Sequence, residues 1–308
     1  MGLIIFTKMT GTTNASSHKF SLAAKAKDYY QLIKFSLSFM VVFSCVICYL
    51  LAPKIVDFDW GMIILLTIAG MLVTGSANAI NQAVEKDTDA QMKRTSSRPV
   101  AAGRMSQQEA YIFAALSGLV GCAMMWYYFN LSAALLSAFS LFLYAFIYTP
   151  LKKVNSTAVL VGAFPGAFPC LIGFVAGNDD FAVGGWILFG IQFLWQFPHF
   201  WAIAWVAHND YSKVGFKLLP TDKGPTKFTA LQAVMYSVLM IPVGVLPHYF
   251  GLTGATSMYI VIVCNLFMVM QSLRLYKEMD VKAARRVMFS SYIYLPIVFL
   301  ALLADKVH

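Results

Sequence analysis

Nine long apolar stretches constrain this chain more than any other feature of its sequence. Each is long enough to cross a hydrocarbon layer about 30 Å thick as a helix. A spanning segment must satisfy its backbone polar groups internally, and stretches of this length favour helices over the alternating strands of a barrel. The chain is therefore predicted to be an all-α, polytopic membrane protein with nine transmembrane helices. The predicted spans are residues 32–52, 60–82, 109–129, 131–149, 157–177, 183–206, 228–247, 251–272 and 285–304.

The composition supports a lipid environment. Of the 308 residues, 59% are hydrophobic and only 12% are charged, whereas about a quarter of the residues in a soluble domain are charged. This excludes a soluble globular enzyme, a disordered protein, a coiled coil and a secreted disulfide scaffold. The five cysteines all lie inside apolar stretches, and they are interpreted as small packing residues.

The basic residues predict the orientation of the spans. Of the 23 lysines and arginines, 21 lie in the amino-terminal segment and in alternate loops, and only Lys54 and Lys306 lie on the opposite side. Because basic residues collect in cytoplasmic loops, the amino terminus is predicted to be cytoplasmic and the carboxyl terminus to lie outside. The net charge of +9 therefore requires no nucleic-acid partner.

Two long polar loops, near residues 82–108 and 207–227, lie on the predicted cytoplasmic side. Long loops in a compact protein are commonly functional, so we expect the catalytic groups there. Residues 1–30 are predicted to be a polar cytoplasmic tail, and residues 31–308 a nine-helix domain. The tail is poor in arginine, unlike an organelle transit peptide, which favours a bacterial inner membrane.

Acidic and basic side chains cluster in the first of these loops. Asn81, Glu85 and Asp89 are spaced four residues apart, so a helix continuing out of the membrane would carry all three on one face. Their hard oxygen atoms suit Mg²⁺ that bridges to phosphate. Arg94 and Arg98 follow, and guanidinium groups match phosphate oxygens. This pattern predicts a site for a magnesium diphosphate that carries an apolar chain.

Further polar side chains fall at the same predicted membrane level. Asp210 and Lys213 follow the sixth span, and the fourth span ends near Tyr148 and Lys152. We expect Asp210 to join the metal ligands and both lysines to join the diphosphate-binding residues. The ring of Tyr148 is a candidate to stabilise an allylic cation. His199 lies inside the sixth span, where polar groups are costly and are often functional.

These motifs carry a resemblance to a known family. The stretches NQAVEKDTDAQMKRT, YTPLKKVN and WQFPHFWAIAW resemble those of the protohaem IX farnesyltransferases (haem O synthases), a branch of the UbiA-type intramembrane prenyltransferases. The resemblance extends over nearly the whole chain from about residue 30. Gln82 and Glu85 stand where the wider superfamily has aspartates, as in the haem branch, and Val206 stands where its second motif has another aspartate.

The resemblance implies a specific reaction. The farnesyl group of farnesyl diphosphate would be joined to a vinyl group of haem b, with addition of water and release of diphosphate. Either His199 or His208 would contact haem as an axial iron ligand, although a buried histidine that only hydrogen-bonds a neighbouring helix is the plain alternative. A haem A synthase is an expected partner.

Two other functions remain to be weighed against this one. A related prenyltransferase would act on a quinone precursor or another aromatic acceptor, but such enzymes retain aspartates where this chain has Gln82 and Glu85. A transporter would place its binding groups near the membrane midplane, whereas the acidic groups here cluster at one surface. Both alternatives rank below the haem reaction.

Overall fold

The computed structural model describes residues 21–221 and 223–307, and this part of the chain is all-helical apart from an isolated β-bridge between Thr253 and Lys306. Its helices are α1 (Leu22–Leu32), α2 (Phe35–Leu50), α3 (Trp60–Val84), α4 (Lys86–Gln91), α5 (Gln107–Tyr128), α6 (Leu131–Phe142), the π-helix η1 (Leu143–Tyr148), α7 (Thr149–Leu151), α8 (Thr157–Asn178), α9 (Val183–Val206), α10 (His208–Lys213), α11 (Lys227–Tyr249), α12 (Ala255–Glu278) and α13 (Val281–Ala304).

The predicted spans are confirmed in number and kind. Within the described residues, eight helical segments are long and apolar enough to cross a membrane, and the bent pair α1 and α2 makes nine if it counts as one span. The pair bends by 51° at Lys34, whose φ of 48° lies in the left-handed region. The predicted tail falls largely on residues 1–20, outside the described part, while α1 occupies the end of that segment.

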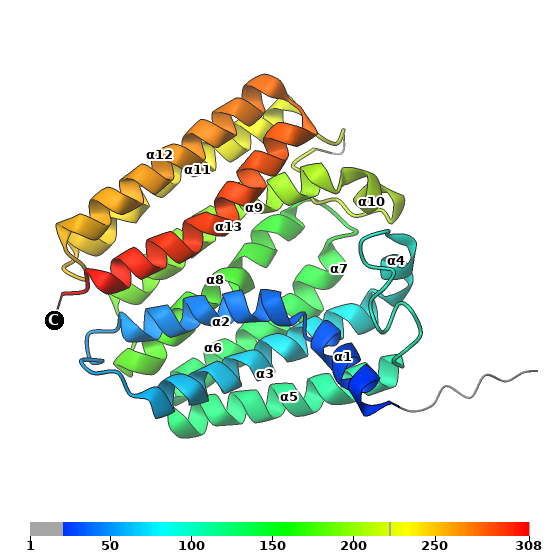
Figure 1. Cartoon of the computed structure of the whole chain (residues 1–308), viewed down its shortest axis with the longest axis horizontal. Helices are drawn as coiled ribbons and strands as arrows, with labels where there is room; N and C mark the ends of the chain where they lie inside the picture. Colours follow the sequence, from blue (N-terminus) through cyan, green and yellow to red (C-terminus); the bar gives the residue numbers. More distant parts are fainter. Residues whose placement is uncertain (1–20, 222, 308) are drawn as a thin grey trace, which may run out of the picture.

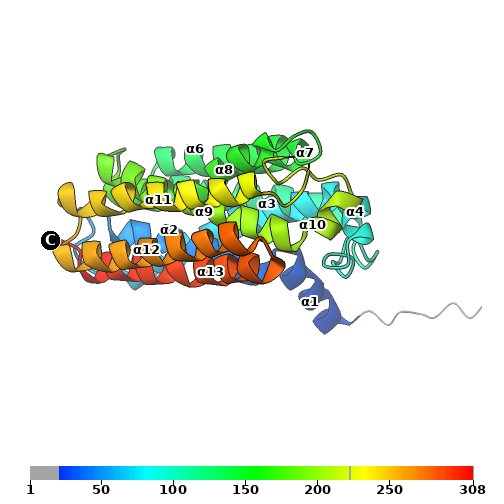
Figure 2. The ribbon, with the colours of Figure 1, turned by 90° about the horizontal axis from the view of Figure 1, so that it is seen from above.

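The helices form a bundle with α8 and α9 at its centre (Figure 1). These two are the most buried of the candidate spans, at 78% and 67% of their apolar windows. Helices α11, α12 and α13 lie on one side of them, and α3 and α5 lie on the other (Figure 1). The short helices α4, α7 and α10 gather at one end of the bundle, opposite the carboxyl terminus (Figures 1 and 2). This end is called the loop end below.

Small residues allow α8 to occupy the centre. A side chain at Gly173 would collide with the backbone carbonyl of Cys45 on α2, and a side chain at Gly166 would collide with the Gln196 amide on α9. Without a driving force from water, membrane helices associate through this kind of close backbone approach. The glycines therefore determine which helices α8 can contact.

The helix predicted to run through the acidic motif is interrupted. Helix α3 ends at Val84, and Glu85 caps both α3 and α4 with φ −91° and ψ 14°. Hydrogen bonds from the Glu85 amide to the Asn81 carbonyl (2.9 Å) and from the Asp89 amide to the Glu85 carbonyl (2.7 Å) still connect residues four apart. The four-residue spacing is therefore retained although the helix is not continuous.

Candidate active site

The acidic motif lies buried at the loop end. Asn81, Glu85 and Asp89 are 2%, 6% and 0% exposed, whereas Asp87, which is out of register with them, is exposed. The predicted common face therefore points into the protein. Buried carboxylates need compensating charges, because an unpaired charge is costly to remove from water.

Basic residues from a distant segment and from the same loop supply those charges. The Lys152 Nζ donates to Glu85 Oε1 at 2.6 Å, and both side chains are buried. The Arg98 guanidinium donates to Asp89 Oδ2 at 2.7 Å. Removing one partner of a buried pair typically costs about 3–5 kcal/mol, because it leaves the other charge uncompensated. Lys152 and Arg98, which the sequence predicted to bind diphosphate, are thus paired with Glu85 and Asp89, which it predicted to bind metal.

Lys34 is a third cation of this cluster, and the sequence analysis counted it only towards topology. Its Nζ donates to Asn81 Oδ1 at 2.9 Å. The left-handed backbone at the bend between α1 and α2 positions it there. The signal that could have identified it was a lone lysine at the edge of an apolar stretch, where a charge is costly and tends to be functional.

The second loop approaches this cluster through aromatic side chains. The Arg94 guanidinium donates to the Tyr211 hydroxyl at 3.1 Å and lies 5.6 Å from the centre of that ring. The ammonium of Lys152 lies 4.8 Å from the Tyr148 ring centre and 5.5 Å from that of Phe216. Cations over aromatic faces are attracted by the ring quadrupole. These contacts bring the two predicted loops and Tyr148 together.

Asp210 lies apart from the acidic pair. It is half-buried on α10, and its ion pair is with Lys213, at 3.9 Å across one turn. Such a loose, exposed pair contributes little to stability. Among the described residues, no three His, Cys, Asp or Glu side chains form a group that could hold a metal ion. The predicted set of metal ligands is therefore only partly brought together, as Asn81, Glu85 and Asp89.

Two buried oxygen atoms in the acidic motif nevertheless suit a cation. Asp89 Oδ1 and Gln82 Oε1 are buried and have no hydrogen-bond partner in the described part of the chain. The Gln82 amide is held by its Nε2, which donates to the carbonyls of Gln31 and Leu32 at 2.9 Å. Unpartnered buried oxygens carry a desolvation penalty, and carboxylate and amide oxygens are ligands that Mg²⁺ accepts. These residues therefore fit a bound divalent cation.

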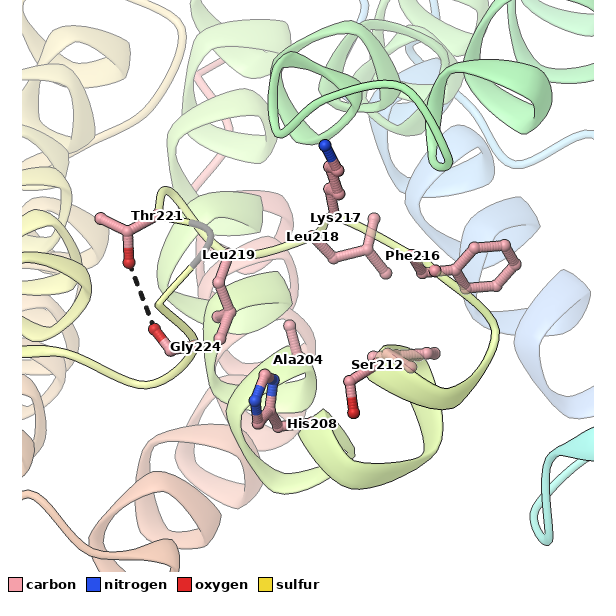
Figure 3. A pocket seen from close by; sticks show the side chains of 11 residues that line it. Ala204, His208, Ser212, Phe216, Lys217, Leu218, Leu219, Thr221 and Gly224 are labelled. Carbon is pink, nitrogen blue, oxygen red and sulfur yellow. Dashed lines mark hydrogen bonds between the residues drawn. The ribbon is translucent and has the colours of Figure 1, made fainter.

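A cavity of about 310 Å³ lies under the second loop (Figure 3). His208 lines it from α10, and Leu218 and Leu219 line it from the loop. Tyr211 and Phe216 also belong to its wall, so the cavity shares residues with the Arg94 and Lys152 contacts described above. It lies beside the charged cluster at the loop end.

The two candidate haem histidines have different surroundings. His199 is 8% exposed within α9, and its Nδ1 lies 2.8 Å from Ser291 Oγ on α13. His208 is half-buried at the start of α10, where its ring lies against Gly224. The structure separates them into a membrane-embedded histidine and a loop-end histidine.

Comparisons with known proteins identify the class of this fold and site. The family model for the UbiA prenyltransferase family matches residues 41–293. A Protoheme IX farnesyltransferase of Cytophaga hutchinsonii is 46% identical over 287 residues, which cover 93% of this chain and 100% of the relative. The chain therefore belongs to the UbiA prenyltransferase family and, within it, to the protoheme IX farnesyltransferases.

Solved structures share the fold at lower identity. A digeranylgeranylglyceryl phosphate synthase aligns with a TM-score of 0.76 and 21% identity, covering 92% of this chain and 98% of the other. A UbiA homologue from Archaeoglobus fulgidus, solved with GPP and Mg²⁺, aligns with a TM-score of 0.67 and 13% identity, covering 89% of this chain and 99% of the other. At these identities the likeness establishes the all-helical membrane fold.

Proposed function

We propose that the chain transfers the farnesyl group of farnesyl diphosphate to a vinyl group of haem b. The observation that carries the proposal is a charged cluster at one end of an apolar bundle, in which Glu85, Asp89 and Lys152 are buried and Lys34 and Arg98 are half-buried. A cluster of this kind binds an anion whose tail is apolar. The identity to a Protoheme IX farnesyltransferase supports haem b as the acceptor.

The reaction balances with water as the third reactant. The bond between C1 of the farnesyl group and the diphosphate oxygen breaks, and its electron pair leaves with diphosphate. The π electrons of the vinyl group form the new bond to C1. Water adds to the cationic vinyl carbon as hydroxide, and its proton passes to diphosphate. The products are haem O and diphosphate.

The basic residues would stabilise the departing charge. Arg98 and Lys152 face the two carboxylates, and Lys34, which donates to the Asn81 amide, adds a basic group that no carboxylate pairs with directly. Arg94 and Lys213 are additional candidates at the same end. Fixed cations aimed at a developing negative charge lower the barrier because they need no reorganisation during the reaction.

A magnesium ion completes the proposed donor site. Asn81, Glu85 and Asp89 are its proposed ligands, with Gln82 as a further oxygen donor, whereas Asp210 lies apart from them on α10. When bound, the ion acts as a Lewis acid that draws electron density from the diphosphate oxygens. The Mg²⁺ present in the Archaeoglobus fulgidus homologue supports this assignment.

The apolar interior would protect the allylic cation. Excluding water from the bundle prevents early quenching of a reactive intermediate. The Tyr148 ring, which already lies 4.8 Å from the Lys152 ammonium, is our candidate to stabilise the cation through its face. His199 and His208 are the candidate haem-binding residues.

We further propose a location and an orientation. Bacterial relatives and the distribution of basic residues support a bacterial inner membrane with the loop end in the cytoplasm. Cysteines introduced at the exposed Ser97 and Asp57 should react with an impermeant maleimide from the inner and outer faces respectively. Labelling from the opposite faces would refute the orientation.

A haem A synthase that accepts the product stays a predicted partner.

The decisive experiment is a turnover assay of the purified chain with haem b, farnesyl diphosphate and Mg²⁺. Mass spectrometry should detect haem heavier by one farnesyl group plus one water. Product from an aromatic acid, with haem b unchanged, would retain the donor site and overturn the acceptor. No product with either acceptor, in folded protein, would overturn the proposed function.

A further inference from the structure

The surroundings of His199 determine which of its ring nitrogens carries a hydrogen. The Ser291 Oγ lies 2.6 Å from the Met288 carbonyl oxygen and 2.8 Å from His199 Nδ1. A serine hydroxyl has one hydrogen, and a carbonyl oxygen can only accept. Two oxygens at 2.6 Å require a hydrogen between them, so the hydroxyl donates to Met288. Ser291 must then accept a hydrogen bond from His199 Nδ1.

This hydrogen bond leaves Nε2 as the unprotonated nitrogen of the neutral imidazole. Among the described residues, none hydrogen-bonds Nε2. A neutral imidazole whose free nitrogen faces no protein donor is the form that ligates a metal. Metal-binding histidines commonly donate their other N–H to a protein oxygen, which sets the tautomer and orients the ring.

Two further contacts hold the ring in place. Trp195 stacks on His199 with centroids 4.5 Å apart and planes inclined by 18°, and the Trp195 indole N–H donates to the Ser291 carbonyl at 3.0 Å. Ser291 thus contacts the histidine with its side chain and the stacking tryptophan with its backbone. A ring restrained on one face and at one nitrogen has little rotational freedom left to lose on binding a ligand.

Tyr292, the neighbour of Ser291 on α13, also contacts the His199 ring. The edge of Tyr292 packs against His199 with centroids 5.3 Å apart. The His199 ring therefore has aromatic neighbours on both α9 and α13.

We propose that Ser291 is a positioning residue that holds His199 with Nε2 free to ligate the iron of the haem acceptor. The inference rests on the proposed function, because it assigns the ligand of the proposed substrate. It selects His199 over His208, whose ring has no hydrogen bond among the described residues to fix its tautomer and lines the loop-end cavity instead. The Nε2 lone pair forms the bond to iron, and no proton is transferred.

The test is haem binding by the purified full-length chain. Binding is measured from the Soret absorption band, and iron ligation from the iron–histidine stretching vibration of ferrous haem. His199→Gly should lose the histidine-ligated spectrum, and added imidazole should restore it. Ser291→Ala should weaken haem binding about 10-fold or more and shift the iron–histidine vibration, because Nδ1 loses its acceptor. Ser291→Thr, which retains a hydroxyl, should recover most of the affinity.

Ser237→Ala is the matched control. Ser237 is also a fully buried helical serine, and its hydroxyl donates to a carbonyl of its own helix, that of Ala233, at 2.8 Å. This variant should bind haem as the unmodified chain does. Farnesyl diphosphate binding should be unchanged in all of these variants, which would exclude general misfolding.

The outcomes separate this inference from the proposed function. Unaltered haem spectra in His199→Gly, or loss of them in His208→Ala alone, would overturn the assignment of His199. An unaltered affinity and vibration in Ser291→Ala would overturn the positioning role of Ser291. If the unmodified chain binds farnesyl diphosphate but no haem, the proposed acceptor fails and this inference fails with it.

Discussion

At the residue scale, the candidate site consists of charges that neutralise one another. Glu85 pairs with Lys152 from a distant segment, and Asp89 pairs with Arg98 in the same loop. The Lys34 ammonium donates to Asn81. Each buried charge would be costly alone. A magnesium diphosphate carries both signs of charge. Its cation can replace the basic partners of Glu85 and Asp89, and its anion can replace the acidic partners of Lys152 and Arg98. This exchange would explain why the proposed metal ligands are paired with the proposed diphosphate ligands in the described structure.

Asp89→Asn tests the acidic half of this exchange. The amide keeps the size of the side chain but loses the charge that faces Arg98 and the proposed metal. We expect turnover to fall about 100-fold or more, measured by mass spectrometry of the haem product. Asp87→Asn, at an exposed neighbouring position, should retain near-normal turnover. Equal activity of the two variants would remove Asp89 from the site.

Lys34→Met tests the residue that the sequence analysis did not assign to the site. Losing one cation should weaken binding of farnesyl diphosphate about 10-fold, in line with about 1.5–3 kcal/mol for a hydrogen bond to a charged group. The binding constant is measured with the magnesium complex. Lys27→Met is the control, because Lys27 is exposed on α1. If both variants bind the donor as the unmodified chain does, Lys34 has no role in donor binding.

At the scale of elements, one turn of π-helix and one glycine position Tyr148. Residues Leu143–Tyr148 form η1, and the Tyr148 ring packs where a side chain at Gly162 on α8 would be, 2.6 Å from its Cβ position. A π-turn within an α-helix often marks a functional site. The ring can face Lys152 only because α8 has no side chain there.

Gly162→Ala should therefore displace the Tyr148 ring. Helix propensity favours alanine over glycine by about 1 kcal/mol, but overpacking costs about 1–3 kcal/mol. We expect lower turnover and no gain in thermal stability. Gly190→Ala, where the added Cβ would meet only an ordinary contact at 3.4 Å, should keep its activity. A fully active Gly162→Ala enzyme would show that the Tyr148 ring position is unimportant.

At the scale of the whole molecule, Lys306, which follows α13, connects this last helix to the end of α2 through hydrogen bonds. The Lys306 Nζ donates to the carbonyls of Leu50, Ala52 and Ile55 at 2.7, 2.8 and 2.5 Å. These carbonyls lie at and just beyond the carboxyl end of α2, where a cation interacts favourably with the helix dipole. The contact lies far from the loop end (Figure 1).

Lys306→Met should lower thermal stability without changing the site. Three carbonyls would lose a charged donor, and we expect a loss of about 2–4 kcal/mol, measured by thermal unfolding in detergent. The Michaelis constant for farnesyl diphosphate should stay unchanged. Lys54→Met is the control, because its pair with Asp179 is exposed and 3.5 Å long. An equal melting temperature for both variants would show that the Lys306 contacts with the end of α2 do not stabilise the fold.

The sequence by itself determined the features that depend on local chemistry. Apolar length indicated the nine spans, because lipid requires helices of that length. The four-residue spacing placed Asn81, Glu85 and Asp89 on one face, and this face was found buried. The motifs also indicated the family, which the comparisons confirmed.

Only the tertiary structure decided which distant side chains meet. No local pattern indicates that Lys152 pairs with Glu85. Nor does one indicate that the left-handed backbone of Lys34 brings its side chain to Asn81, or that Ser291 contacts His199. The break at Glu85 was also missed, because the side-chain spacing is the same with or without it. These features depend on how helices pack, and packing is determined by close approaches such as that of α8 to α2, which involve residues more than a hundred positions apart.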